Sequence, residues 1–217
     1  MEEVLEALDA LPRDRKCIQL FKYSFDTYRI TEFPLVLLEF KDLEHLDISN
    51  TNIKVIPPEI GQLTKLRKLH LDFNEFDKLP PEIGQLTELR VLSLDHNKLR
   101  GLPDEICNLT NLCSLDCEFN KISSLPKNIG NLVNLKKLNA LSNNLTTLPI
   151  SLCTLPECKV DLYFNDIETL PMVFKQLTKV DYGTQRGRGL YNTYVTFQYE
   201  PPMTFQTFIA KLQRVLQ

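Results

Sequence analysis

The sequence predicts an α/β protein in which short parallel strands stack side by side as a right-handed solenoid, with a helical cap at each end. Two observations lead to this prediction: a hydrophobic pattern recurs every 23 residues along most of the chain, and both ends carry apolar residues at helical spacing. A period of about 20 to 50 residues is typical of solenoids, whose units bury their apolar faces only against their neighbours. With 217 residues, 43% of them hydrophobic, the chain can form one such core.

The repeated unit reads LxxLxLxxNxLxxLPxxIxxLxx. Copies of it begin at Leu43, Leu66, Leu89, Leu112 and Leu135. The last of these copies is one residue short, so the following unit begins at Glu157. We also expect a degenerate first copy that begins at Leu20 and places Tyr23 and Phe25 in the strand. Residues 20–179 therefore hold seven units.

Each part of the unit has a structural reason. The fourth and sixth residues alternate with polar ones, so they share one face of a short strand and point into the core. The asparagine at the ninth place can satisfy backbone groups of a turn, and stacked copies are expected to form a ladder. The Leu-Pro step excludes a central strand and begins an irregular or 3₁₀ return segment, whose apolar residues close the core.

This pattern resembles the leucine-rich repeat family, and the resemblance covers residues 20–179. The LPxxIGxL variant looks most like the intracellular class found in plants, in animal Ras-pathway scaffolds and in bacterial proteins that include effectors of pathogens. The family implies a horseshoe-shaped solenoid that binds other proteins on its concave side. The resemblance therefore implies a non-catalytic protein-interaction module that acts as a scaffold, inhibitor or effector. The alternative is the recognition domain of a larger signalling or enzymatic protein, such as a kinase, ubiquitin ligase or immune receptor.

The ends of the chain are expected to close the solenoid. Residues 1–19 place apolar side chains on one helical face and are interpreted as an N-terminal helical cap. Residues 180–217 contain a loop, a strand indicated by the alternation of Val195, Phe197 and Tyr199, and an amphipathic helix that we interpret as the C-terminal cap.

Charge and apolar runs argue against two classes of partner. The net charge of −3 gives no attraction to nucleic acid or anionic membranes, and no apolar run approaches the roughly 18 residues of a membrane span. Arg186 and Arg188 stand beside glycines, as in some RNA-binding segments, but without an RRM, KH or OB signature they do not indicate nucleic-acid binding. The acidic start of the chain is unlike a secretory signal.

The six cysteines are interpreted as reduced structural thiols rather than as disulfides or a metal site. Cys117 takes a place that holds leucine in other copies, and Cys107 and Cys153 take a glycine place. Short paired Cys/His spacings typical of metal sites are missing, so no metal or cofactor is expected. Reduced thiols favour a location in the cytoplasm. A bacterial effector would be delivered into the cytoplasm of a host cell.

Outward-facing residues of each strand are expected to line the concave wall, with neighbouring copies roughly 4.8 Å apart. The fifth and seventh places form an acidic stripe, the eighth place forms an aromatic one, and lysines at the third place form a basic margin. The residues expected to bind a partner are Asp26, Asp47, His70, Asp72, Phe73, Asp95, His96, Asp116, Glu118, Phe119 and Phe164. Exposed aromatic anchors beside charge predict a protein partner with a basic or mixed surface, bound by a monomer.

One row of the wall invites an enzymatic interpretation. Asp47, His70 and Ser93 occupy the same place on three consecutive strands, so an acid, a base and a nucleophile would be lateral neighbours. An open wall offers no evident oxyanion hole or substrate pocket, and catalysis depends on such preorganised donors. The sequence therefore favours a binding protein over an enzyme.

Overall fold

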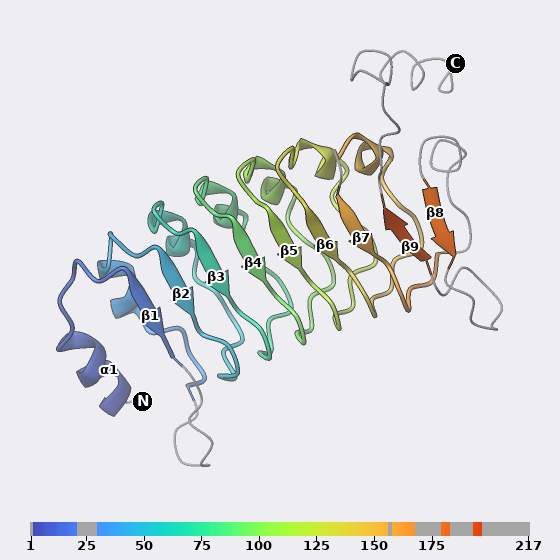
Figure 1. Ribbon diagram of the computed structural model, residues 1–217. Coiled ribbons are helices and arrows are strands. Elements are labelled where there is room, and N and C mark those ends of the chain that lie inside the picture. The colour runs from blue at the N-terminus through green and yellow to red at the C-terminus, as the bar shows by residue number, and fades with distance from the viewer. Residues whose placement is uncertain (1, 21–29, 156–157, 168–178, 183–192, 197–217) are drawn as a thin grey trace.

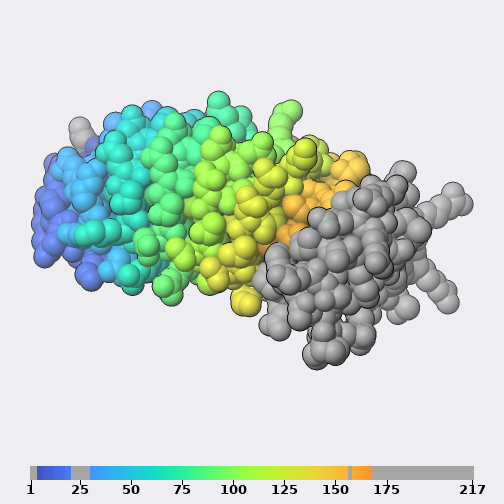
Figure 2. Space-filling view, turned by 90° about the horizontal axis from the view of Figure 1, so that it is seen from above, coloured from blue at the N-terminus to red at the C-terminus, as the bar shows by residue number. Residues whose placement is uncertain are grey.

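The repeats form a sheet backed by a layer of short 3₁₀ turns. The computed structural model describes residues 2–20, 30–155, 158–167, 179–182 and 193–196. The strands lie side by side in one open sheet, and the 3₁₀ segments form a second layer behind it (Figure 1). Seen from above, the repeats succeed one another in chain order along the length of the molecule (Figure 2). The predicted α/β solenoid is confirmed.

Within the described residues, nine strands make up the sheet. They are β1 Cys17–Gln19, β2 His45–Asp47, β3 Lys68–His70, β4 Val91–Ser93, β5 Ser114–Asp116, β6 Lys137–Asn139, β7 Lys159–Asp161, β8 Lys179–Tyr182 and β9 Thr193–Thr196. Neighbours from β1 to β7 are parallel, and their middle residues face one another, as in Leu46 with Leu69 and Leu92 with Leu115. These middle side chains are fully buried, while the residues before and after them point to the opposite face. We call that opposite face the open face; it is the wall that the sequence predicts to bind a partner.

The short copy near the end of the array has the predicted register. Leu138 on β6 pairs with Val160 on β7, as expected for a unit that begins at Glu157.

The register expected for the first copy is wrong. Ile18 pairs with Leu46, so the first strand lies at β1 rather than around Tyr23. Ile18 is 4% exposed and Leu20 packs against the core, so these residues supply the buried alternation closer to the N-terminus. Tyr23 and Phe25 lie outside the described residues.

The return segments are 3₁₀ turns, as predicted. They span Leu35–Glu39, Pro58–Gln62, Pro81–Gln85, Asp104–Asn108, Ile129–Asn131 and Ile150–Thr154. Five of the six follow a proline at their N-terminal flank, where the fixed φ directs the chain away from the strand. Ile60 and Ile83 within them are fully buried and close the core opposite the sheet.

Successive turns approach closely at a glycine. A Cβ atom built on Gly84 would lie 2.4 Å from the carbonyl oxygen of Glu105 in the next repeat. Gly130 is similarly close to Ser151, where the carbonyl oxygen would be 2.2 Å from the added atom. Glycine is therefore required at these two places by the approach of the neighbouring backbone.

The expected asparagine ladder is present. Asn97 donates to the carbonyl oxygens of Leu71 in the preceding repeat (2.9 Å) and Leu94 in its own (3.1 Å), and its Oδ1 accepts from the Phe76 amide (3.1 Å). The same pattern recurs at Asn74, Asn120, Asn143 and Asn165. Each amide is 8% exposed or less. The ladder thus satisfies backbone groups that the turn leaves without partners.

The cysteines of the repeats lie at the places that the 23-residue pattern predicts. All six thiols are free. Cys117 is fully buried in a leucine place and lies 3.2 Å from the Asn139 carbonyl oxygen, and burial raises the pKa of its thiol. Cys107 and Cys153 are 4% and 3% exposed, which suits small residues that fill a glycine place.

A helix, α1 Glu2–Asp9, lies beside the first repeat (Figure 1). Its Leu8 is 3% exposed and belongs to the core, while Val4 and Leu11 pack against that core. In the described part of the chain, none of the helices is long and apolar enough to cross a membrane.

At the other end, β9 lies between β7 and β8 and is antiparallel to both. The strand predicted around Val195 is therefore present, although its direction was not foreseen. The expected C-terminal helix and the segment with Arg186 and Arg188 lie outside the described residues.

Candidate protein-binding surface

The parallel ladder continues beyond the strands and places the seventh and eighth residues of each unit. The amide of Phe73 donates to the Asp95 carbonyl oxygen (2.9 Å), and that of His96 to the Glu118 carbonyl oxygen (3.1 Å). Each eighth residue is thereby attached to the seventh residue of the next repeat. The acidic and aromatic stripes are therefore fixed side by side on the open face.

The eighth residue has an unusual backbone conformation. Its φ is 54° at Phe73, 52° at His96, 48° at Phe119 and 53° at Phe164. Left-handed φ is a genuine outlier for bulky residues and costs on the order of 1–3 kcal/mol each. Asn50, which has φ 54° in the same place, belongs to a residue type that tolerates this conformation better. The eighth place therefore holds aromatic rings although the left-handed backbone conformation is unfavourable for them.

Three of these rings form a stack across adjacent repeats. The centroids of Phe73 and His96 are 4.3 Å apart with planes 17° from parallel, and those of His96 and Phe119 are 4.4 Å apart. Phe73 and Phe119 are 52% and 44% exposed. The stack presents a continuous apolar strip to solvent, since contact between the rings covers only part of each.

Two acids of the stripe beside the stack influence each other's ionisation. The Asp95 amide donates to Asp72 Oδ1 (3.0 Å), which holds the two residues together. Burial and the adjacent Asp72 raise the pKa of Asp95 to about 8. Burial also works against ionisation of Asp72, but the nearby His70 and the hydrogen bonds from Asp95 and Ser93 lower its pKa to about 2. The raised pKa of Asp95 reduces the charge repulsion between the two neighbouring acids.

The fifth-place row does not form a catalytic relay. The Ser93 hydroxyl donates to Asp72 instead of His70, and the Asp47 carboxylate accepts from the Ser49 hydroxyl (2.6 Å). His70 Nδ1 lies 3.7 Å from Asp72 Oδ2, and the attraction of this carboxylate is the main cause that raises the pKa of His70. Lateral proximity therefore does not produce an acid–base–nucleophile chain.

The predicted binding residues fall into three groups. Asp72, Phe73, Asp95, His96, Glu118 and Phe119 come together beside the ends of β3, β4 and β5. Asp47, His70 and Asp116 lie in the adjacent row at the fifth place, and Phe164 stands apart, 61% exposed, in contact with Tyr163. Asp26 lies outside the described residues, and the residue that pairs with Asp47 on the first strand is Gln19.

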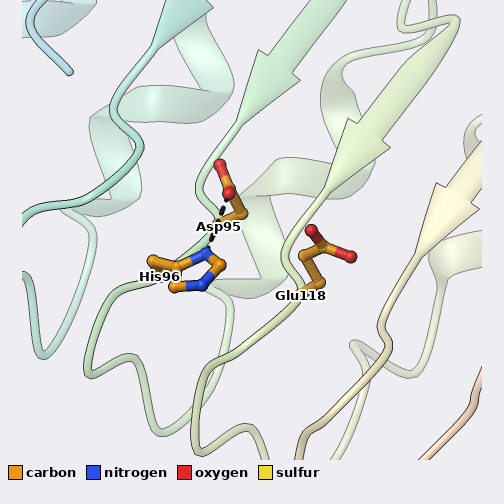
Figure 3. Close-up of side chains that lie close together, drawn as sticks. All are labelled: Asp95, His96 and Glu118. Carbon is orange, nitrogen blue, oxygen red and sulfur yellow. Dashed lines mark hydrogen bonds and ion pairs between the residues drawn. The ribbon is translucent and has the colours of Figure 1, made fainter. Parts of the chain in front are cut away.

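The contacts that orient these acids were not predicted from the sequence. Asn139 Nδ2 donates to Glu118 Oε2 (2.8 Å), and Lys137 Nζ lies 3.1 Å from Asp116 Oδ2. The acidic and aromatic stripes were predicted as separate features, whereas His96 of the aromatic stripe lies close to carboxylates of the acidic stripe (Figure 3). The 23-residue spacing, which makes Glu118 the lateral neighbour of Asp95, is the sequence signal that could have predicted this proximity.

Comparisons with known proteins agree with this architecture. Residues 18–119 match the family model described as a leucine-rich repeat region. This part of the chain is a leucine-rich repeat region. A curated relative, leucine-rich repeat-containing protein 10 of Bos taurus, is 40% identical over 48 residues, which are 22% of this chain and 17% of the relative.

Two solved leucine-rich repeat structures are similar, each with a TM-score of 0.63. A leucine-rich repeat protein of Leptospira interrogans is 37% identical, and the match covers 66% of this chain and 37% of the Leptospira chain. The ectodomain of the plant membrane receptor kinase GASSHO1/SCHENGEN3 from Arabidopsis thaliana, in complex with CASPARIAN STRIP INTEGRITY FACTOR 2, is 30% identical, covering 72% of this chain and 19% of its own. The chain thus spans less than two fifths of each of these proteins. Leucine-rich repeats are general protein-interaction modules and are typically non-catalytic.

Proposed function

We propose that this chain is a non-catalytic module that binds a protein partner through the open face, as a cytoplasmic monomer acting as scaffold, inhibitor or effector. The observation that carries the proposal is the stack of Phe73, His96 and Phe119, which is exposed and held in a backbone conformation that bulky residues seldom adopt. Asn50 and Ser142 have the same φ in the same place, so the backbone conformation belongs to the repeat, and the exposed, stacked rings are what support binding here.

The chemistry of the strip indicates the partner. Exposed aromatic rings are the side chains that most often dominate interface energies once a partner covers them. The acids at the fifth and seventh places, among them Asp47, Asp116 and Glu118, provide negative charge along the same strip. A basic segment of the partner would find apolar contact and opposite charge together, which favours both anchoring and fast association.

Two further observations support parts of the proposal. The Ser93 hydroxyl is committed to Asp72, which supports a binding role over a catalytic one. Six free thiols support a reducing compartment such as the cytoplasm.

Affinity purification with three forms of the full chain tests the proposal. We expect the wild type to capture a partner that Phe73→Ala with Phe119→Ala does not. The control is Val55→Ala with Val133→Ala, which removes two side chains that are 58% and 54% exposed in other parts of the chain. This control should capture the same partner as the wild type. Equal capture by all three forms would refute binding through the stack.

A further inference from the structure

Three side chains that commonly bind metals converge at the centre of the open face. Asp95, His96 and Glu118 each offer one ligand atom, and these atoms all lie within 4.8 Å of one another. Asp95 Oδ2 is 3.0 Å from His96 Nδ1. Figure 3 shows the imidazole turned toward Asp95, with the Glu118 side chain beside it on the next repeat. Two consecutive repeats thus contribute two carboxylates and one imidazole to one place.

We propose that Asp95, His96 and Glu118 bind a zinc ion on the open face. Zinc takes imidazole nitrogen and carboxylate oxygen at about 2.0–2.2 Å, and three protein ligands with one water complete a tetrahedron. Ligand atoms of such a tetrahedron are roughly 3.3 Å apart, so Asp95 and His96 are already near this spacing. The partly exposed Glu118 side chain closes the remaining gap by rotation. The imidazole argues against calcium or magnesium, which prefer oxygen ligands alone.

Residues outside the cluster hold its members in place. The imidazole of His96 lies between the rings of Phe73 and Phe119, with centroids 4.3 and 4.4 Å away, which limits its rotation. Asn139 donates to Glu118 Oε2 (2.8 Å) and leaves the other carboxylate oxygen for a cation. Hydrogen bonds of this kind orient metal ligands and raise affinity. Binding therefore requires rotation of the Glu118 side chain but little movement of Asp95 and His96, whose ligand atoms are already 3.0 Å apart.

The neighbouring repeats lack the imidazole. The place of His96 is taken by Phe73 one repeat earlier and by Phe119 one repeat later, with φ within a few degrees of the same value in all three. The His96→Phe variant therefore removes a ligand while it installs the residue that the same backbone already accepts on both sides. This makes it a matched test of the site.

Isothermal titration of metal-free full-length protein with zinc chloride alone tests the proposal. Cys17 and Cys113 are the thiols that are not buried, so every form carries Cys17→Ser and Cys113→Ser to remove binding by thiolates. We expect one zinc ion per chain, and at least tenfold weaker binding in His96→Phe. Asp161→Asn, which removes an acid elsewhere on the open face, should keep the affinity within about threefold, since only screened long-range charge is lost.

Thermal unfolding of each form without zinc verifies that it is folded. Absence of zinc binding by the wild-type site, or equal binding by His96→Phe, would overturn the proposal. The titration contains no partner protein, so its failure would leave the proposed protein binding intact. Conversely, zinc binding would stand even if the stack captured no partner.

Discussion

At the scale of the residue, the ninth and eighth places of the repeat show what a sequence pattern can and cannot specify. The ninth place holds asparagine in five copies, so its ladder of hydrogen bonds could be predicted from the recurrence alone. The eighth place holds Asn50, Phe73, His96, Phe119, Ser142 and Phe164, and all have φ between 48° and 54°. Most of these residue types give no sign of a left-handed backbone. That conformation is imposed by the ladder to the next repeat, which the sequence of one unit does not reveal.

Loss of an asparagine from the ladder should lower the stability of the protein substantially. Asn97→Leu leaves the Phe76 amide and the Leu71 carbonyl group without their partner inside the core. We expect the free energy of unfolding to fall by about 3 kcal/mol, since buried unsatisfied groups cost about 1–3 kcal/mol each. Urea denaturation followed by circular dichroism measures this loss.

The matched control uses the chain's own variation. Thr51 occupies the ninth place in one copy and hydrogen-bonds to Ile48 and Asn74. Asn97→Thr should therefore cost clearly less than Asn97→Leu. If the two variants were equally stable, the hydrogen bonds would not be the source of the stabilisation.

At the scale of the element, the strands and 3₁₀ turns from Leu43 onward follow the predicted pattern, because every copy repeats the same buried alternation and the same Leu-Pro step or a close variant. The first strand did not follow it. Ile18 with Leu20 and Tyr23 with Phe25 offer the same spacing, and the sequence alone gives no measure of which pair reaches the ladder of β2. Long-range pairing decided the register there, as it did for the antiparallel β9.

Because one 3₁₀ turn packs closely on the next, a side chain at Gly84 should clash with the neighbouring repeat. A Cβ atom there would meet backbone atoms of Glu105, which have no freedom to rotate away. We expect Gly84→Val to lower the free energy of unfolding by about 3 kcal/mol or more, through overpacking. Gly101 has nothing within 4 Å of an added Cβ atom, so Gly101→Ala should leave stability nearly unchanged. Comparable melting temperatures for Gly84→Val and wild type would show that the turns are not in tight contact.

At the scale of the whole molecule, stability depends on neighbours, so the ends are its weak points. The described sheet ends with β8 and β9 on one side, and α1 lies at the other (Figure 1). The sequence could predict the row of candidate binding residues because each lies at a fixed place in the unit. It could not predict which acids are engaged, as Asp72 is by Ser93 and Asp95, because these contacts depend on residues from adjacent repeats.

Disruption of α1 should loosen the first repeats. Leu8 is 3% exposed, so Leu8→Asp would place a charge against the core. We expect a lower melting temperature and binding of a hydrophobic dye, since an unpaired buried charge costs several kcal/mol. Glu6→Asp, on the exposed side of the same helix, should behave like the wild type. A Leu8→Asp protein with unchanged melting would show that α1 does not protect the core.

Charge on the open face should act mainly on the rate of association. Asp47→Asn with Asp116→Asn removes two negative charges but keeps side-chain oxygens that accept hydrogen bonds. With the captured partner, we expect slower association at low salt, a difference that shrinks as ionic strength rises, and little change in dissociation. Asp77→Asn with Asp104→Asn makes the same change in charge at exposed positions away from the strands and should have a smaller effect. Equal association rates for the two double variants would show that the acidic stripe does not steer the partner.

The affinity of the purified partner for the Phe73→Ala, Phe119→Ala protein tests the central claim most directly. Biolayer interferometry should give a dissociation constant raised roughly thirtyfold or more, corresponding to a loss of about 2 kcal/mol from two aromatic anchors. The melting temperature should fall little, because both side chains are about half exposed and lie outside the core. An unchanged dissociation constant in a folded variant would contradict the claim that the aromatic stack on the open face is the binding site.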